Sequence, residues 1–177
     1  MAGLLVKMVK TIVDTLCRYG ECCRLDLTDI VILLLYCFGT QCSILELMLS
    51  LYMIRELLDL KFEIVPTISL TALRIVRSLS YNGQILIRDS RIELTEEGRR
   101  RAHELLSKLR KFKYVATSCF VLVEGSIFLQ ELERVTGTVR SVGSRRLFVT
   151  LIEDIVVRNS PQLLDLADRV LKELVRD

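Results

Sequence analysis

Residues 85–102 read ILIRDSRIELTEEGRRRA, and this stretch decides which fold the sequence predicts. Two apolar-rich runs of four residues flank Asp89 and Ser90, a pattern typical of two strands joined by a two-residue turn. Thr95 follows as a candidate N-cap, and the two glutamates after it suit the positive end of a helix. Gly98 would permit close packing against the preceding helix. The stretch therefore predicts a β-hairpin that leads directly into a helix.

The composition indicates a large aliphatic core or a buried oligomer interface. Of the 177 residues, 51% are hydrophobic and 6% aromatic, and the length fits one domain with or without an appendage. The longest apolar stretches, 30–38, 44–58 and 115–129, are shorter than the ~20 residues of a spanning helix, and the last two contain charged residues. No secretory signal pattern is present. We therefore expect a cytoplasmic protein without membrane contact.

Helical periodicity covers most of the chain, so the predicted fold class is mainly α. The sequence offers Asp26 or Thr28 as the cap of a second helix, and residues 61–66 (KFEIVP) alternate like a short strand. The helix after the hairpin extends at least to Lys113, and the sequence leaves open whether it continues beyond 116–118. Two glycines within 136–143 predict a linker. The predicted helices are 4–19, 28–38, 44–60, 69–82, 95–113, 144–158 and 161–175.

The order of elements over residues 28–113 resembles a winged helix-turn-helix domain, with three helices, a hairpin and a further helix. The segment IELTEEGRRRA at 92–102 looks like the motif that closes the hairpin in many archaeal and bacterial winged-helix proteins. The layout of 43–94 is similar to the Panacea/SocA-like and YwgA-like families. Residues 62–66 (FEIVP) depart from them, because those families carry aromatic-rich Tyr, Gly and Pro motifs there.

This resemblance implies three regions. A winged-helix domain at 28–113 would be flanked by an N-terminal helix within 1–27, packed on the core or on a partner. A C-terminal helical region at 114–177 would serve dimerisation, because the helices at 144–158 and 161–175 have apolar faces too wide to cover each other alone. We therefore expect a homodimer.

A DNA-binding winged helix would place its third helix in the major groove and its wing near the backbone or minor groove. The helix at 69–82 would then turn Leu70, Leu73, Val76 and Leu79 inward. Arginine can bind phosphates or guanine edges, and the hydroxyl residues add hydrogen bonds. The candidate DNA-binding residues are Thr71, Arg74, Arg77, Ser78, Arg88, Ser90, Arg91, Arg99, Arg100 and Arg101.

Scarce Asn and Gln beside abundant Arg and Glu indicate a thermophilic source. The expected function is a dimeric, DNA-binding transcriptional regulator of a thermophilic archaeon or archaeal virus. The alternative is a protein-interaction or scaffold module built on a winged helix, whose arginines pair with glutamates on a solvated surface.

Five of the six cysteines crowd into residues 17–42. Disulfides, buried free thiols and a metal site are all open interpretations, and disulfides are common inside hyperthermophiles. Structural zinc prefers shorter spacings between its cysteine ligands, often with histidine, and the sole His103 is remote in sequence, so the metal site is least favoured. A bridge from Cys17, Cys22 or Cys23 to Cys37 or Cys42 would tie the first helix to the second. The disulfide candidates are Cys17, Cys22, Cys23, Cys37 and Cys42.

The sequence offers no catalytic constellation. His103 lies on a basic helix without an evident Ser or Cys partner, and Gly137 and Gly143 are isolated rather than part of a phosphate loop. Cys119 lies in an apolar segment and is expected in the core. We therefore expect neither an enzyme nor a bound cofactor or metal.

Overall fold

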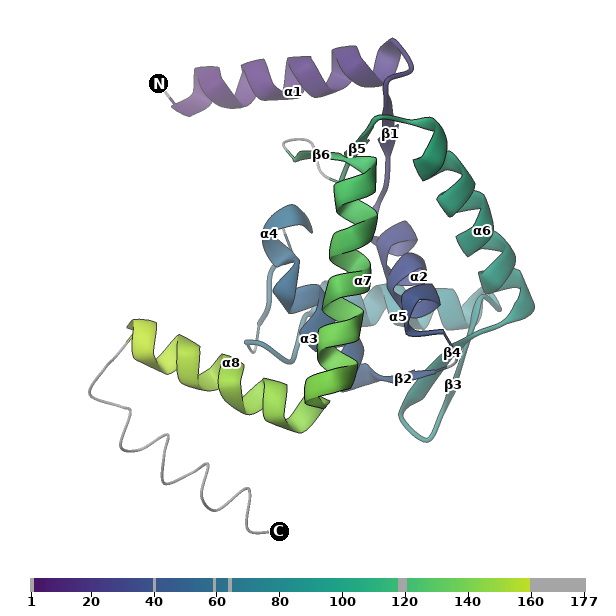
Figure 1. Cartoon of the computed structure of the whole chain (residues 1–177), viewed down its shortest axis with the longest axis vertical. Coiled ribbons are helices and arrows are strands. Elements are labelled where there is room, and N and C mark those ends of the chain that lie inside the picture. The colour runs from purple at the N-terminus through teal and green to yellow at the C-terminus, as the bar shows by residue number, and fades with distance from the viewer. Residues whose placement is uncertain (1, 40, 59, 64, 118–120, 160–177) are drawn as a thin grey trace.

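The structure is a computed structural model that describes residues 2–39, 41–58, 60–63, 65–117 and 121–159 (Figure 1). Within these ranges the chain is mainly helical, as predicted, and holds two three-stranded sheets. The helices are α1 (Ala2–Arg18), α2 (Leu27–Phe38), α3 (Ile44–Met53), α4 (Arg55–Leu58), α5 (Leu70–Tyr81), α6 (Glu96–Lys111), α7 (Gly125–Val142) and α8 (Ser144–Asn159). The strands are β1 (Cys22–Arg24), β2 (Cys42–Ser43), β3 (Ile85–Arg88), β4 (Arg91–Leu94), β5 (Tyr114–Ala116) and β6 (Leu122–Glu124).

Local capping sets where the central helices begin. The Asp26 carboxylate accepts a hydrogen bond from the Asp29 amide at 2.8 Å, so Asp26 is the cap of α2. A complete capping box opens α3: the Ser43 hydroxyl accepts from the Glu46 amide at 3.1 Å, and the Glu46 carboxylate accepts from the Ser43 amide at 2.6 Å. These short-range signals are legible in the sequence, which explains why these helix starts were predicted.

Helix α2 is the centre of the core. Residues 30–35 are all buried, because this helix is apolar around its whole circumference and is covered by α5, α6 and α7. Helix α7 contributes a buried stripe at helical spacing, formed by Phe128, Leu132, Val135 and Val139. One continuous apolar cluster therefore joins the segments before and after the hairpin.

The predicted hairpin is confirmed, and the structure fixes its register. Ile85 pairs with Leu94 and Arg88 with Arg91, and Asp89 and Ser90 form the turn with φ angles of 47° and 62°. Two consecutive positive φ angles are what a type I′ turn requires, and this turn matches the twist of the flanking strands. Strand β2 pairs antiparallel with β4, so the sheet order is β2-β4-β3.

The second sheet was not predicted. Strand β1 pairs in parallel with β5, and β5 pairs antiparallel with β6, which gives the order β1-β5-β6. The chain is therefore extended rather than helical at Tyr114–Ala116 and Leu122–Glu124, which answers the question the sequence left open. Each strand has three residues, too few for an alternating pattern to stand out in the sequence.

Two predictions about non-helical segments are wrong, and the helix predicted at 44–60 is interrupted at Ile54. The described residues of 61–66 form no strand: residues 61–62 are irregular and 65–66 lie in a turn, the Glu63 amide donates to the Ile68 carbonyl at 2.9 Å, and the Val65–Pro66 peptide is cis. Residues 136–143 are not a linker, because α7 continues to Val142 and ends at Gly143. Burial of the neighbouring apolar residues of α7 outweighs the weak helix propensity of Gly137.

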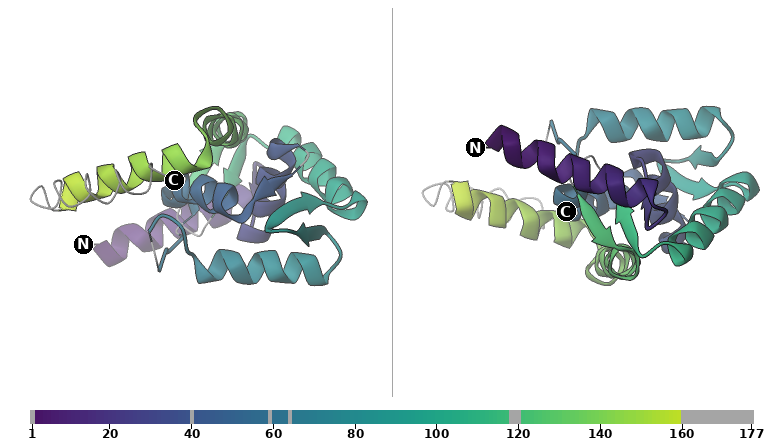
Figure 2. Two further views of the ribbon diagram at one scale, coloured as in Figure 1. Left: turned by 90° about the horizontal axis from the view of Figure 1, so that it is seen from below. Right: turned by 90° about the horizontal axis from the view of Figure 1, so that it is seen from above.

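Helices α1 and α8 project from the same side of the molecule (Figures 1 and 2). The C-terminal half of α1 packs through Val13 and Leu16 onto the sheet of β1, β5 and β6. Helix α8 begins at Ser144, as predicted, and buries Leu147 against the main core. The helix predicted at 161–175 and the core position predicted for Cys119 lie outside the described residues.

Substitution of Gly98 would test how closely the start of α6 packs against the rest of the chain. A Cβ at this position would lie 2.1 Å from the Gln84 carbonyl oxygen and 2.9 Å from Leu94 Cδ2, so the close approach is to the α5–β3 connection rather than to a helix. We expect Gly98→Ala to lower the free energy of unfolding by about 1–3 kcal/mol, measured by urea denaturation.

Gly137→Ala is the matched control. This glycine also lies inside a helix, but nothing is within 4 Å of its added Cβ, so the substitution should raise stability by up to about 1 kcal/mol. Equal effects of the two substitutions would contradict the steric interpretation.

Candidate nucleic-acid interface

The outer face of α5 carries the residues expected to read DNA. Thr71, Arg74, Arg77 and Ser78 are all exposed, as the helical pattern predicted. The inward positions are partly different from the prediction, because Leu70 is 49% exposed and Ala72 is buried beside Val76 and Leu79. Leu70 is the first residue of the helix and lies beyond the stripe at 72, 76 and 79 that packs on the core.

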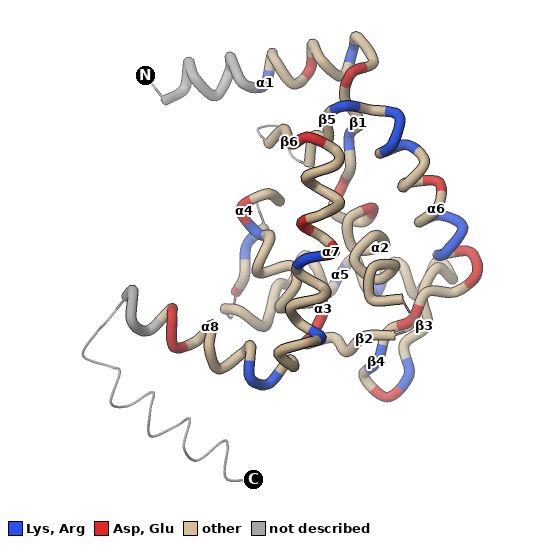
Figure 3. The backbone as a smooth tube through the Cα atoms, viewed as in Figure 1, with Lys and Arg blue, Asp and Glu red and all other residues tan. Residues whose placement is uncertain are grey.

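The hairpin turn presents two more arginines. Arg88, Ser90 and Arg91 are exposed, and Figure 3 shows the cations on both sides of the acidic turn. A pocket of about 310 Å³ lies against this turn, lined by Gln41, Arg88, Asp89, Arg91, Ile92 and Glu93. The two arginines therefore share their surroundings with two carboxylates, and the turn is mixed in charge.

The arginines at the start of α6 differ from one another. Arg101 binds Asp29 of α2 at 3.0 Å and so joins two helices of the core. Arg100 contacts Glu97 at 2.7 Å, and its hydrogen bonds hold the pKa of Glu97 below its usual value. Arg99 donates to the Leu94 carbonyl at 3.4 Å. Two of these three arginines, which were predicted to contact DNA, thus have carboxylate partners within the chain.

Four of the predicted residues have no such partner. Among the described residues, no carboxylate lies within ion-pair distance of Arg74, Arg77, Arg88 or Arg91. Their side chains are exposed and lie on α5 and on the hairpin that follows it. These guanidinium groups are therefore available to an external anion.

An apolar groove separates α5 from the hairpin, and the sequence did not predict it. Its volume is about 490 Å³, and Tyr81 at its edge is 94% exposed. The groove arises because β3 returns beside α5, so the signal lay in tertiary contact rather than in a local pattern. Its lining consists of Ile44, Leu73, Val76, Arg77, Ser80, Tyr81 and Ile87.

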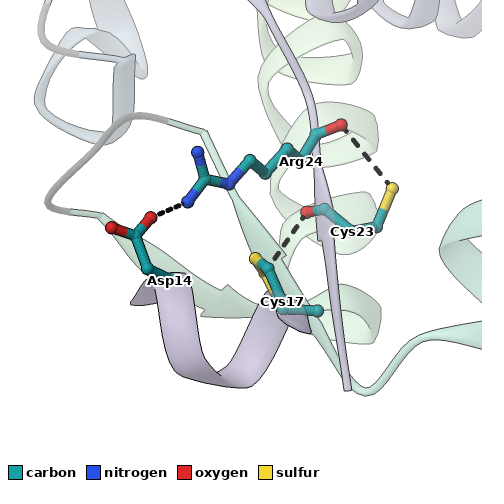
Figure 4. Close-up of a disulfide and its surroundings, with 5 residues drawn as sticks. Asp14, Cys17, Cys23 and Arg24 are labelled. Carbon is teal, nitrogen blue, oxygen red and sulfur yellow. Dashed lines mark hydrogen bonds and ion pairs between the residues drawn. A yellow bond between two sulfur atoms is a disulfide. The ribbon is translucent and has the colours of Figure 1, made fainter. Parts of the chain in front are cut away.

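The cysteines divide into one bridge and free thiols. Cys17 and Cys22 form a disulfide that joins α1 to β1, beside an ion pair between Asp14 and Arg24 (Figure 4). The predicted bridge between the first two helices is therefore not found. The remaining described cysteines, Cys23, Cys37 and Cys42, are free. Burial raises the pKa of Cys37 to about 11 and of Cys42 to about 12.

No described group of side chains suggests a metal centre or a membrane anchor. Within the described ranges, no cluster of three or more His, Cys, Asp and Glu residues could hold a metal ion. The described helices also include none with the length and apolarity to cross a bilayer. The ring of His103 packs edge-on against Tyr36, with centroids 5.2 Å apart, which accounts for its position on α6.

Comparison of the chain with protein-family models, with curated proteins and with solved structures found no match. The resemblance to winged-helix families therefore stays a prediction, and the function is argued from the geometry alone.

The Cys17–Cys22 disulfide predicts how many additional thiols reduction releases. In denaturant, reduction should increase the number of titratable thiols by two, because Cys17 and Cys22 are bonded to each other. Cys17→Ser should abolish this increase, whereas Cys37→Ser should preserve it, since Cys37 is free. An unchanged count on reduction of the unmodified protein would contradict the bridge.

In the folded protein Cys42 should resist alkylation at pH 8, because burial keeps its thiol protonated.

Proposed function

We propose that the chain is a winged-helix protein that binds double-stranded DNA. The connectivity supports this: α2, β2, α3 and α5 precede the hairpin β3–β4, and β2 completes the sheet beside β4. In this proposal α5 is the helix that enters the major groove, and the hairpin is the wing.

The observation that carries the proposal is the contrast between paired and unpaired arginines. Arginines on a solvated surface are expected to pair with acids, and Arg100, Arg101 and Arg134 do so. The arginines of α5 and of the hairpin turn are also exposed but lack carboxylate partners among the described residues. A phosphate backbone supplies the missing negative charge.

The chemistry of each element suits a different part of a duplex. Arg74 lies on the outer face of α5 with Thr71 and Ser78, where a guanidinium group can bind a guanine edge and the hydroxyls can bind bases or phosphates. Arg88 and Arg91 flank the wing turn and would bind backbone phosphates. We therefore assign recognition to α5 and backbone anchoring to the hairpin.

The proposed regulator is a homodimer. The projecting helices α1 and α8 support this, because Ile12 on α1 is 54% exposed and Val142 before α8 is also exposed. Burial of such apolar surface against a second copy is a common basis of two-fold association.

A protein-interaction module is the second candidate. The groove between α5 and β3 favours it, because apolar side chains line a cavity large enough for a side chain of a partner, with Tyr81 fully exposed at its edge. In the DNA-binding proposal the same apolar surface would contact thymine methyl groups. Absence of DNA binding at low salt would favour the interaction module.

DNA binding should depend steeply on salt. We expect the affinity for random duplex DNA to fall as salt rises, measured by fluorescence anisotropy. Replacing Arg88 and Arg91 together by alanine should lower the slope of log affinity against log salt by about 2, because each lost phosphate contact removes about 0.9. The matched control replaces Arg110 and Lys111, two exposed cations at the far end of α6, and should leave the slope unchanged. Equal slopes for all three proteins would remove the hairpin from the interface.

The proposed homodimer can be tested separately from DNA binding. Sedimentation at micromolar concentration should show twice the monomer mass. A monomer alone under these conditions would contradict the proposed dimer but not DNA binding by a single winged helix.

A further inference from the structure

A second group of unpaired arginines lies at the corner between α7 and α8. Arg140 is in the last turn of α7, and Arg145 and Arg146 are in the first turn of α8. All three are exposed, and no described carboxylate lies within ion-pair distance of them. Figure 3 shows cations at the start of α8 and at the hairpin turn, both toward the lower side of that view.

The corner lies close to the end of α2, which precedes β2 of the hairpin sheet. The Arg140 guanidinium lies 5.6 Å from the centre of the Phe38 ring and approaches the connection between α2 and β2 at Gly39. Two residues further along, Gln41 lines the pocket that also contains Arg88 and Arg91. Seen from below, the hairpin lies between α5 and the corner (Figure 2, left). The basic residues therefore follow one another from α5 across the hairpin to the corner.

The acidic residues that face this surface are few. Asp89 and Glu93 share the pocket at the hairpin turn. Glu46 is engaged in the capping box of α3 and is partly buried. Near the corner, the first turn of α8 contains no acidic residue, although acids are favoured there by the helix dipole. Local helix stability therefore does not explain Arg145 and Arg146.

We propose that the α7–α8 corner is a second phosphate-contact surface, which binds the duplex where it extends past the hairpin. This inference rests on the proposed DNA-binding function. A long polyanion is the fitting ligand, because the cations are spread over separate elements instead of converging on one point as they would around a small anion. The duplex would contact α5, the hairpin and the corner in succession.

Duplexes of two lengths distinguish DNA contact at the corner from DNA binding at the primary site of α5 and the hairpin. The full chain and an Arg145→Ala/Arg146→Ala variant are titrated with duplexes of about 10 and about 25 base pairs, roughly one turn and more than two turns of DNA. The variant should bind the short duplex like the parent. It should bind the long duplex about tenfold more weakly at low salt, with a salt slope lower by about 2. Arg140 is left in place because it packs on Phe38.

Each result decides the inference. The Arg110→Ala/Lys111→Ala control removes the same charge from α6 and should match the parent on both duplexes. Equal weakening of the corner variant on both lengths, or no weakening on either, would overturn the corner contact. If the Arg88→Ala/Arg91→Ala variant still loses affinity in that case, the primary site stands. A parent protein that binds neither duplex would overturn both the corner contact and the proposed function.

Discussion

Thr95 makes the junction on which the proposed interface depends. Its hydroxyl donates to the Gly83 carbonyl at 2.7 Å and accepts from the Gly98 amide at 3.1 Å, while its own amide donates to the Gln84 carbonyl at 3.1 Å. One residue thereby ties the end of α5, the end of the hairpin and the start of α6. Gly98 completes the junction, since only a residue without a side chain fits against the Gln84 carbonyl.

This junction fixes the geometry of the candidate site. Because the hairpin begins immediately after α5 and ends at Thr95, its two strands cannot shift along each other without breaking the cap of α6. The orientation of Arg88 and Arg91 relative to α5 is thus set by backbone hydrogen bonds rather than by flexible side chains. Surface ion pairs are weak, typically under about 1 kcal/mol, so pairing between charges would not supply this rigidity.

The sequence predicted the parts of the fold that depend on neighbouring residues. The hairpin with its two-residue turn follows from Asp89 and Ser90 and from the apolar-rich runs around them, and helix starts follow from caps such as Ser43 and Ser69. The same reasoning found the exposed face of α5, with an error at Leu70 because periodicity alone does not show where a helix leaves the core.

Contacts between distant residues could not be predicted in this way. The parallel pairing of β1 with β5 and the ion pair between Asp29 and Arg101 join segments that share no local pattern. The cysteine pairing was likewise open, because several partners are equivalent in sequence and only the turn after α1 brings Cys17 and Cys22 together. For the same reason the sequence grouped Arg100 and Arg101 with the other candidate arginines, whereas the fold gives these two carboxylate partners and gives none to Arg74, Arg77, Arg88 or Arg91 among the described residues.

The helix dipole gives a second way to distinguish basic residues that stabilise the fold from those available to a ligand. Lys108, Arg110 and Lys111 occupy the last turn of α6, where the negative end of the helix dipole favours cations, so their presence has a structural explanation. Arg145 and Arg146 occupy the first turn of α8, where the dipole opposes them and no acid compensates. An external anion would convert this unfavourable arrangement into a favourable one. The basic residues in the last turn of α6 therefore say little about ligands, and the group at the α7–α8 corner says more.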